Sequence, residues 1–356
     1  MCEEASVQGI GPGTVLGGRY TTHELAAPFG EGELWTARDS ILDRTVTIVA
    51  VSRQHPNVAA FLDAARRVAG LDNNRLSRIL DVGTDDEVAY VVEESLEGSR
   101  TLTEILESGP LPAPEVRRMA GETSLVLDIA RQRGLHHQRL NPSHVLRTQD
   151  GDVKLRGLAT LAALAGVDDT PDQEAAREDA KSVVAITYAG FTGRWPLEGD
   201  GGGLDPAPRV ASHVAAPSEI AASVPADLDA LCRLTFANDQ GPTTPGDFAR
   251  QIAPWSPIPI LLPTVTSESP VRRDDSIPAP AAAGLVASRM PVRPGDMDPE
   301  VDEPTVARSV AHSSDVHPTD TDLTDADLTD ADPTDGDATG DGATRAVESD
   351  GAADGA

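Results

Sequence analysis

The chain has 356 residues, a formal net charge of −29 at pH 7 and a pI near 4.4. Nucleic-acid phosphates are bound by faces rich in Lys and Arg, so this charge excludes a nucleic-acid partner. The two cysteines, Cys2 and Cys232, support neither a disulfide framework nor a metal site. The acidic start and the lack of an apolar run of roughly 18 residues argue against a signal peptide or membrane insertion. We therefore expect a cytoplasmic location and no cofactor or metal.

The first 100 residues have the pattern of a sheet with one helix. Residues 1–18 are Gly-rich and polar, and we expect a flexible N-terminus there. Alternating apolar residues then predict three strands, beginning at Tyr20, at Glu33 and at Arg44. Apolar residues at helical spacing predict one amphipathic helix over 58–71. Two further strands are predicted at 79–83 and 88–93.

The character of the sequence changes after Gly98. Helices are predicted over 101–107, 114–133, 179–191, 227–236 and 244–252, with Gly134 as the stop of the second. A small β-rich lobe therefore precedes a mainly helical one. From Pro263 onward Pro, Ser, Ala, Asp and Thr dominate, a composition that cannot offset chain entropy by apolar burial. We expect residues 256–356 to be a disordered acidic tail.

The order of segments over residues 19–255 resembles the protein kinases of actinobacteria. GLHHQRLNPSHVL (134–146) is similar to the catalytic loop, and VKLRGLA (153–159) to the metal-binding strand and turn. YVVEESLEG (90–98) resembles the hinge, and YAGFTGRWPL (188–197) a segment that braces the C-lobe. The resemblance implies an α+β, two-lobed protein kinase-like fold, with a small β-rich N-lobe, a mainly helical C-lobe and a disordered acidic tail.

The same resemblance assigns kinase roles to residues that cannot perform them. Phosphoryl transfer needs positioned charges around the transferred group. The nucleotide lysine falls at Val49 and its glutamate partner at Ala64. The catalytic base, the phosphate lysine, the metal asparagine and the metal aspartate fall at Arg139, Asn141, His144 and Gly157. In the phosphate loop Ala27 and Phe29 replace two glycines and only Gly32 remains. We therefore expect no catalytic, cofactor-binding or metal-binding residue, and no enzyme.

The tail carries a second pattern. Each of four threonines, Thr319, Thr324, Thr329 and Thr334, has Asp three positions later. The chain looks most like the MviN-associated pseudokinases, which implies as partners a forkhead-associated (FHA) domain protein, which reads phosphothreonine, and a lipid flippase. We therefore predict that a separate Ser/Thr kinase phosphorylates one of these threonines. The alternative is a solubilising acidic tail in which threonines near aspartates are a matter of composition.

Three functions are left open in order. The first is a non-catalytic pseudokinase that binds and scaffolds, in peptidoglycan precursor export or cell-wall synthesis, at the inner face of the membrane through partners. The second is an atypical active Ser/Thr protein kinase that binds ATP. The third is a metal-independent nucleotide or anion sensor that uses Arg139, although we expect this arginine in an ion pair. His136, His137 and His144 are expected to be structural.

Overall fold

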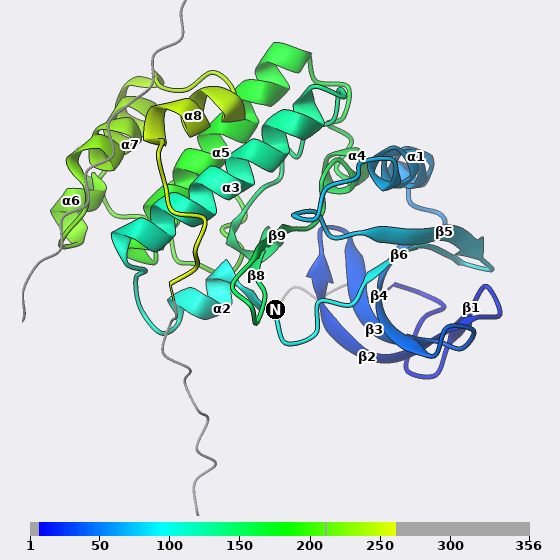
Figure 1. The fold of residues 1–356 in the computed structure, drawn as a ribbon. Coiled ribbons are helices and arrows are strands. Elements are labelled where there is room, and N and C mark those ends of the chain that lie inside the picture. Colours follow the sequence, from blue (N-terminus) through cyan, green and yellow to red (C-terminus); the bar gives the residue numbers. More distant parts are fainter. Residues whose placement is uncertain (1–6, 211, 261–356) are drawn as a thin grey trace, which may run out of the picture. The chain divides into compact units, whose positions relative to one another are not determined.

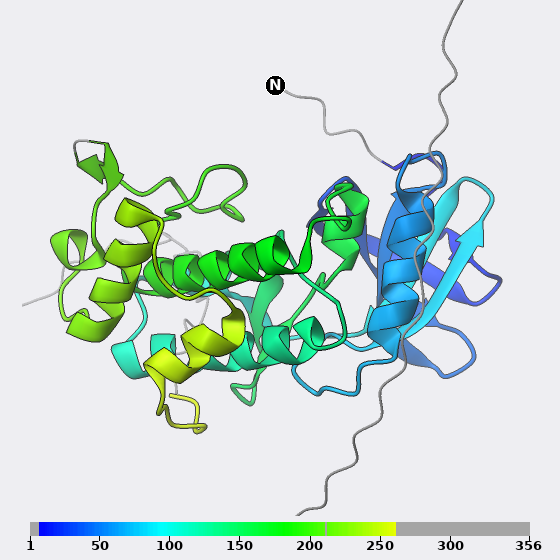
Figure 2. The same ribbon diagram turned by 90° about the horizontal axis from the view of Figure 1, so that it is seen from above.

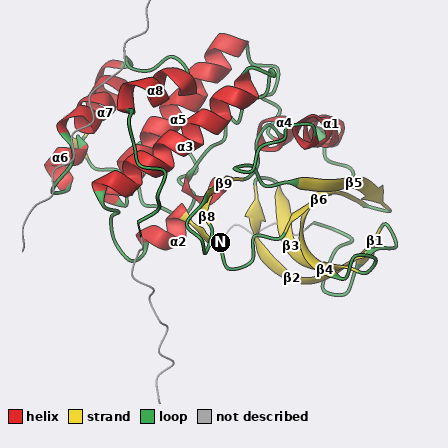
Figure 3. Cartoon of the chain, viewed as in Figure 1, coloured by secondary structure: helices red, strands yellow, loops and turns green. Residues whose placement is uncertain are grey.

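The first part of the chain forms an antiparallel sheet of order β1-β2-β3-β4-β6-β5 (Figures 1 and 3). The computed structural model describes residues 7–210 and 212–260. The strands are β1 (Val15–Leu16), β2 (Tyr20–Phe29), β3 (Gly32–Asp39), β4 (Arg44–Ser52), β5 (Ile79–Asp85) and β6 (Val88–Glu94). Three strands predicted from alternation, β2, β3 and β4, are its centre.

Both faces of this sheet are covered. Along β4, Val46, Ile48 and Ala50 belong to one apolar cluster, while Val49 and Val51 belong to another. Successive residues of a strand point to opposite faces, so the nearly continuous apolar run of β4 is that of a strand buried on two sides.

The helix α1 (Val58–Ala69) covers one face of the sheet and runs along it in the view from above (Figure 2). Its apolar residues Phe61, Leu62 and Ala65 pack on that face. A short helix, α4 (Thr160–Leu164), lies beside α1 and adds Leu161 and Leu164 to the same cluster.

The second part is mainly helical. Its helices are α2 (Leu102–Leu106), α3 (Ala113–Arg131), α5 (Asp172–Thr192), α6 (Pro217–Ile220), α7 (Ala226–Asn238) and α8 (Pro245–Ile252). Helix α5 packs against α3, α7 and α8, and fourteen of its residues are buried. One of them, Tyr188, is fully buried and its hydroxyl donates to the carbonyl of Ala215 at 2.9 Å. A buried hydroxyl needs such a partner, and this one holds the segment before α6.

Small strands complete this part of the chain. They are β7 (Arg100–Thr101), β8 (Val145–Arg147) and β9 (Val153–Leu155) in one sheet, and β10 (Arg209–Val210) with β11 (His213–Val214) in another; a 3-10 turn, η1 (Pro142–His144), precedes β8. A β-rich N-lobe followed by a mainly helical C-lobe is the two-lobed protein kinase-like fold expected from the sequence.

Three of the differences between the structure and the sequence expectations concern the N-terminus, α5 and α4. Residues 7–18 are not a free N-terminus: Val7 is buried, its N–H donates to Glu33 at 2.9 Å, and β1 pairs with β2. Helix α5 begins at Asp172, because Ala175 and Ala176 are buried although charged residues surround them. Helix α4 was not predicted, since five residues are too few for a periodic pattern.

Within residues 7–210 and 212–260, no helix has the length and apolarity needed to span a membrane. The predicted disordered tail, apart from its first five residues, lies outside the described residues.

Candidate functional site

The segment that resembles a catalytic loop is fixed by one buried carboxylate. Asp179 of α5 is fully buried and accepts hydrogen bonds from the N–H of His137 at 3.0 Å and of Gln138 at 2.6 Å. Gln138 has φ 54°, a left-handed conformation that few residues other than Gly adopt. These two bonds hold it there, so the shape of the loop is set by α5.

Two buried imidazoles lie inside this loop. His137 Nε2 donates to the carbonyl of Arg156 at 2.9 Å, and desolvation by burial lowers the pKa of His137. His144 Nδ1 accepts from the N–H of Asn141 at 3.3 Å, and burial lowers the pKa of His144 well below its usual value. The two rings are 5.4 Å apart, and Phe29 lies 6.4 Å from His144. Both imidazoles are therefore neutral at pH 7, because burial disfavours the charged form and two adjacent imidazolium ions would repel each other.

The third histidine has the opposite character. The carboxylate of Asp179, 3.6 Å from Nδ1, raises the pKa of His136 most, and a hydrogen bond between Nε2 and Asp172 at 3.0 Å raises it further. Among the described residues no cluster of three or more His, Cys, Asp or Glu side chains could hold a metal ion.

The space below the turn between β2 and β3 is filled by apolar side chains. Phe29 is 2% exposed and shares a cluster with Leu161 and Leu164 of α4. A Cβ added at Gly30 would lie 3.1 Å from Leu161 Cδ2, so the turn rests directly on α4. Glu31 points elsewhere, with its carboxylate 3.0 Å from His55 Nε2.

Most positions that the resemblance assigns to the nucleotide are in packed surroundings, although Ala27 is only half-buried. Val49 and Ala64 are buried in two different apolar clusters, so they do not form a pair. Gly157 has φ 82°, and a Cβ there would lie 2.4 Å from Leu161 Cδ1. Ala27 is on β2, and Gly32 begins β3, where a Cβ would lie 2.6 Å from the carbonyl of Ala50. These residues do not fit a magnesium nucleotide held in the manner that the resemblance implies.

Two ion pairs at the joint between the lobes were not predicted. Arg156 Nε donates to Glu93 Oε2 at 3.1 Å, and Ser77 donates to the same oxygen at 2.7 Å. Lys154 Nζ is 2.6 Å from Glu94 Oε1. The signal was present in the sequence, because two glutamates end the otherwise apolar strand β6 and a Lys and an Arg flank a buried leucine.

A cleft of about 710 Å³ lies beside α4, between the turn of β2 and β3 and the C-lobe. Polar residues that line it include Arg139, Asn141, Glu178, Lys181, Asp200 and Asp239, and apolar residues that line it include Trp195, Leu197 and Phe236. This cleft brings Arg139 and Asn141 together with α5 and the loop after Trp195.

Most charges in the cleft are already paired. Lys181 Nζ lies 3.2 Å from Asp239, Arg209 lies 3.5 Å from Glu198, and Asn141 Nδ2 donates to Asp200 at 2.8 Å. Arg139 is exposed, and among residues 7–210 and 212–260 no hydrogen bond or ion pair involves its side chain. The expected ion pair of Arg139 is therefore absent from the described residues, and the arginine is available to bind an anionic group.

The candidate phosphosites Thr319, Thr324, Thr329 and Thr334 lie outside the described residues. The structure places none of them relative to the cleft.

Comparisons with known proteins point to one activity. The chain is 28% identical over 247 residues to the serine/threonine-protein kinase PknL of Mycobacterium tuberculosis, a match that covers 63% of this chain and 62% of PknL. It is 27% identical over 250 residues to the probable serine/threonine-protein kinase CPE1738 of Clostridium perfringens, covering 64% of this chain and 36% of that protein. For the serine/threonine-protein kinase PksC of Streptomyces coelicolor the identity is 27% over 250 residues, with 61% and 45% covered. The chain thus spans about a third to two thirds of the length of these relatives.

Other comparisons add less. No protein-family profile matches the chain. A crystal structure of Rad53 residues 1–466 in complex with AMP-PNP superposes with a TM-score of 0.42 at 19% identity, over 50% of this chain and 49% of that one. A superposition at this level does not establish the fold, which follows from the order and packing of the elements.

These relatives contradict two expectations from the sequence. We expected a non-catalytic scaffold and no enzyme, and the similar proteins are named as Ser/Thr protein kinases. The scaffold interpretation is wrong on this finding. The similarity favours the second function left open above, an atypical active kinase.

Proposed function

We propose that the chain is an atypical Ser/Thr protein kinase whose reacting groups meet in the cleft that contains Arg139. The observation that carries the proposal is the similarity to Ser/Thr kinases, which covers 63% of this chain in the match to PknL. The cleft offers the exposed guanidinium of Arg139 and the carboxylate of Asp200 to a ligand. The usual nucleotide position is packed with Phe29, Leu161 and Leu164.

Arg139 has the chemistry of an anion-binding group rather than of a base. A guanidinium stays protonated in proteins and has five N–H donors, so it cannot accept the proton of a hydroxyl. An exposed arginine in a cleft binds phosphate through charge-assisted hydrogen bonds. We assign to Arg139 the binding of a phosphate group of the donor or of the phosphorylated product.

Asp200 is the carboxylate that we assign as proton acceptor for the substrate hydroxyl. It lines the same cleft and accepts from Asn141 Nδ2 at 2.8 Å and from the N–H of Gly202 at 2.8 Å. Asn141 belongs to the loop that resembles a catalytic loop, so this bond ties Asp200 to it. A carboxylate at this place performs general-base catalysis once a hydroxyl lies within hydrogen-bond distance.

The test is transfer of ³²P from γ-labelled ATP, with Mg²⁺ or Mn²⁺, to the full chain itself and to a mixed-sequence acceptor protein. Wild-type protein incorporates label, Asp200→Asn lowers the rate about 100-fold, and Arg139→Ala lowers it and raises the KM for ATP. Glu198→Gln is the matched control, because Glu198 lines the same cleft but its side chain is 92% exposed. No incorporation with either metal ion overturns the kinase proposal.

A second candidate is a nucleotide or anion sensor that works without metal. The unpaired guanidinium of Arg139 favours it, together with the lack of a metal-binding cluster in the described residues. A ligand that binds only the native state raises the melting temperature. We expect ATP or inorganic phosphate to raise it equally with and without EDTA, and Arg139→Ala to abolish the shift. A wild-type melting temperature unchanged by both ligands rules the sensor out.

The partners remain proposals that rest on the sequence pattern and the resemblance to MviN-associated proteins. We assign the four tail threonines as sites for a separate Ser/Thr kinase, an FHA domain as their reader, and a lipid flippase as a second partner that brings the chain to the inner face of the membrane. FHA-domain binding is measured before and after phosphorylation, with a variant in which Thr319, Thr324, Thr329 and Thr334 are alanine. Binding that phosphorylation does not increase retires the FHA assignment.

A further inference from the structure

After α8 the chain turns back along α3, toward α2 and β8 (Figure 1). We call residues 253–260 the strap. The strap packs directly on two glycines. A Cβ added at Gly121 would lie 2.6 Å from the ring of Trp255, and one added at Gly151 would lie 2.4 Å from Pro259. Between these points Ser256, Pro257 and Ile258 are exposed. The strap is therefore attached at its two ends, with little burial between them.

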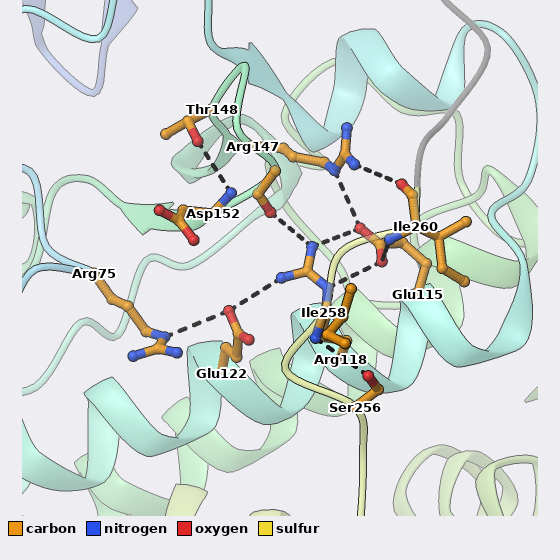
Figure 4. Close-up of polar contacts among 11 residues, drawn as sticks. Arg75, Glu115, Arg118, Glu122, Arg147, Thr148, Asp152, Ser256, Ile258 and Ile260 are labelled. Atoms are coloured by element: carbon orange, nitrogen blue, oxygen red, sulfur yellow. Dashed lines mark hydrogen bonds and ion pairs between the residues drawn. The ribbon is translucent and has the colours of Figure 1, made fainter.

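The far end of the strap is held by polar contacts to the backbone of its last residue, Ile260. The N–H of Ile260 donates to Glu115 Oε2 at 3.2 Å, and its carbonyl accepts from Arg147 Nη2 at 2.6 Å. Arg147 Nε also donates to Glu115 Oε1 at 3.1 Å (Figure 4). Glu115, Arg147 and Ile260 thus close a ring of three contacts.

This ring continues into a line of charged side chains, of which Arg118 and Glu122 are buried and Arg75 is 38% exposed. Arg118, whose side chain is 2% exposed, lies 2.6 Å from Glu115 and 3.2 Å from Glu122, and donates to the carbonyl of Gly151 at 2.9 Å. Arg75, in the segment before β5, lies 3.4 Å from Glu122 (Figure 4). The line connects the strap, helix α3, the turn between β8 and β9, and the N-lobe.

The charges in this line do not balance among themselves. Three guanidinium groups face two carboxylates, and the carbonyls of Ile260 and Gly151 supply the further acceptors. Buried cations without acceptors are costly. If Ile260 moves away, Arg147 loses a hydrogen-bond acceptor and Glu115 loses a donor. Arg118 is affected indirectly, through its ion pair with Glu115.

We infer that the strap is a latch that positions the β8–β9 hairpin, with Glu115 and Arg147 as positioning residues. Arg147 ends β8, which follows directly on Asn141 and η1, and β9 leads to Arg156 at the lobe joint. The strap thus contacts the last residue of β8, and the candidate-site loop with Asn141 joins the start of the same strand. Residues 261–356 continue from the latch in the sequence, so a partner that pulls on them acts on this hairpin.

The test uses the full chain and hydrogen exchange read by mass spectrometry. Ile260→Pro removes the N–H that donates to Glu115 and leaves the pair of Glu115 with Arg147 in place; Arg147→Gln removes both contacts of the guanidinium. Arg66→Gln on α1 is the control, since Arg66 is exposed and the described residues give its side chain no polar partner. Melting temperatures confirm that each variant is folded.

We expect both variants to raise exchange about fivefold in residues 253–260 and, in parallel, in residues 145–155 and 71–79, while Arg66→Gln changes none of them. A strap that is only passively attached gives a different result. Faster exchange in residues 253–260 alone, or no change in any of the three segments in Ile260→Pro, overturns the latch.

Discussion

Arg156 and Glu93 form a buried ion pair that joins the two lobes, with Nε 3.1 Å from Oε2 and side chains 11% and 4% exposed. Glu93 is near the end of β6, and Arg156 follows β9 directly. Ser77 donates to the same carboxylate at 2.7 Å. The pair therefore connects three segments at the joint.

Removal of one member of this pair leaves a buried charge without its partner. We predict that Glu93→Gln and Arg156→Met each lower the free energy of unfolding by about 3–5 kcal/mol. The double variant costs less than the sum of the two, because no charge is then left alone. Urea denaturation measures the free energy of unfolding of the three variants. Arg38→Gln is the control, because Arg38 pairs with Asp43 at the surface and its loss should cost at most about 1 kcal/mol. Additive single losses would show that the two side chains do not interact.

The stability contributed by His136 depends on pH. Asp179 and then Asp172 raise its pKa in the folded state, so its contribution is fully present below the unfolded pKa of about 6.5 and is lost as pH rises through the folded pKa. Burial lowers the pKa of His137 and of His144, and these two act with the opposite sign. The difference between wild type and a His136 variant separates the two effects.

We therefore predict that His136→Gln loses most stability relative to wild type at pH 5.5–6 and progressively less toward pH 8. Chemical denaturation at several pH values gives this difference directly. His23→Gln, at an exposed position, serves as the control. A difference between His136→Gln and wild type that grows with pH contradicts the prediction.

Gly157 and Gly193 separate backbone strain from steric overlap. Both have positive φ, 82° and 64°, but a Cβ at Gly193 would meet nothing within 4 Å, whereas one at Gly157 would lie 2.4 Å from Leu161 Cδ1. Gly193→Ala should cost about 1–2 kcal/mol for the left-handed backbone alone. Gly157→Ala should cost more, and Leu161→Ala in the same chain should recover part of the excess. Equal costs at the two glycines would show that Leu161 moves aside freely.

Asp179 is predicted to be the side chain that fixes the candidate loop. Asp179→Asn weakens charge-assisted bonds to two backbone N–H groups and should lower the free energy of unfolding by about 2–3 kcal/mol. Hydrogen exchange at residues 136–141 should rise with it. Asp63→Asn, on the exposed face of α1, is the matched control and should leave both values unchanged. Unaltered exchange in the loop would show that other contacts hold Gln138.

Much of the N-lobe could be predicted because its strands and α1 have regular apolar periods. The meeting of segments 134–146 and 153–159 could be expected from the resemblance, and two backbone hydrogen bonds join them, from the N–H of Arg156 to the carbonyl of His144 and from the N–H of Ala159 to the carbonyl of His136. Whether Arg139 has an ion-pair partner could not be predicted, because this depends on which side chains the fold brings near it. The expectation that the chain is no enzyme is contradicted by relatives that are named as Ser/Thr kinases, because absent motif residues do not exclude acidic side chains that other loops supply.

By itself the sequence determined the longer strands and helices, their division into a β-rich and a helical part, and the acidic charge, since these follow from local periodicity and composition. Tertiary structure decided the rest. Arg156 pairs with Glu93, Asp179 holds the loop, and Glu115 holds the strap across 145 positions of sequence. Such pairs have no local signal, because burial makes each charge depend on a partner that only folding brings close.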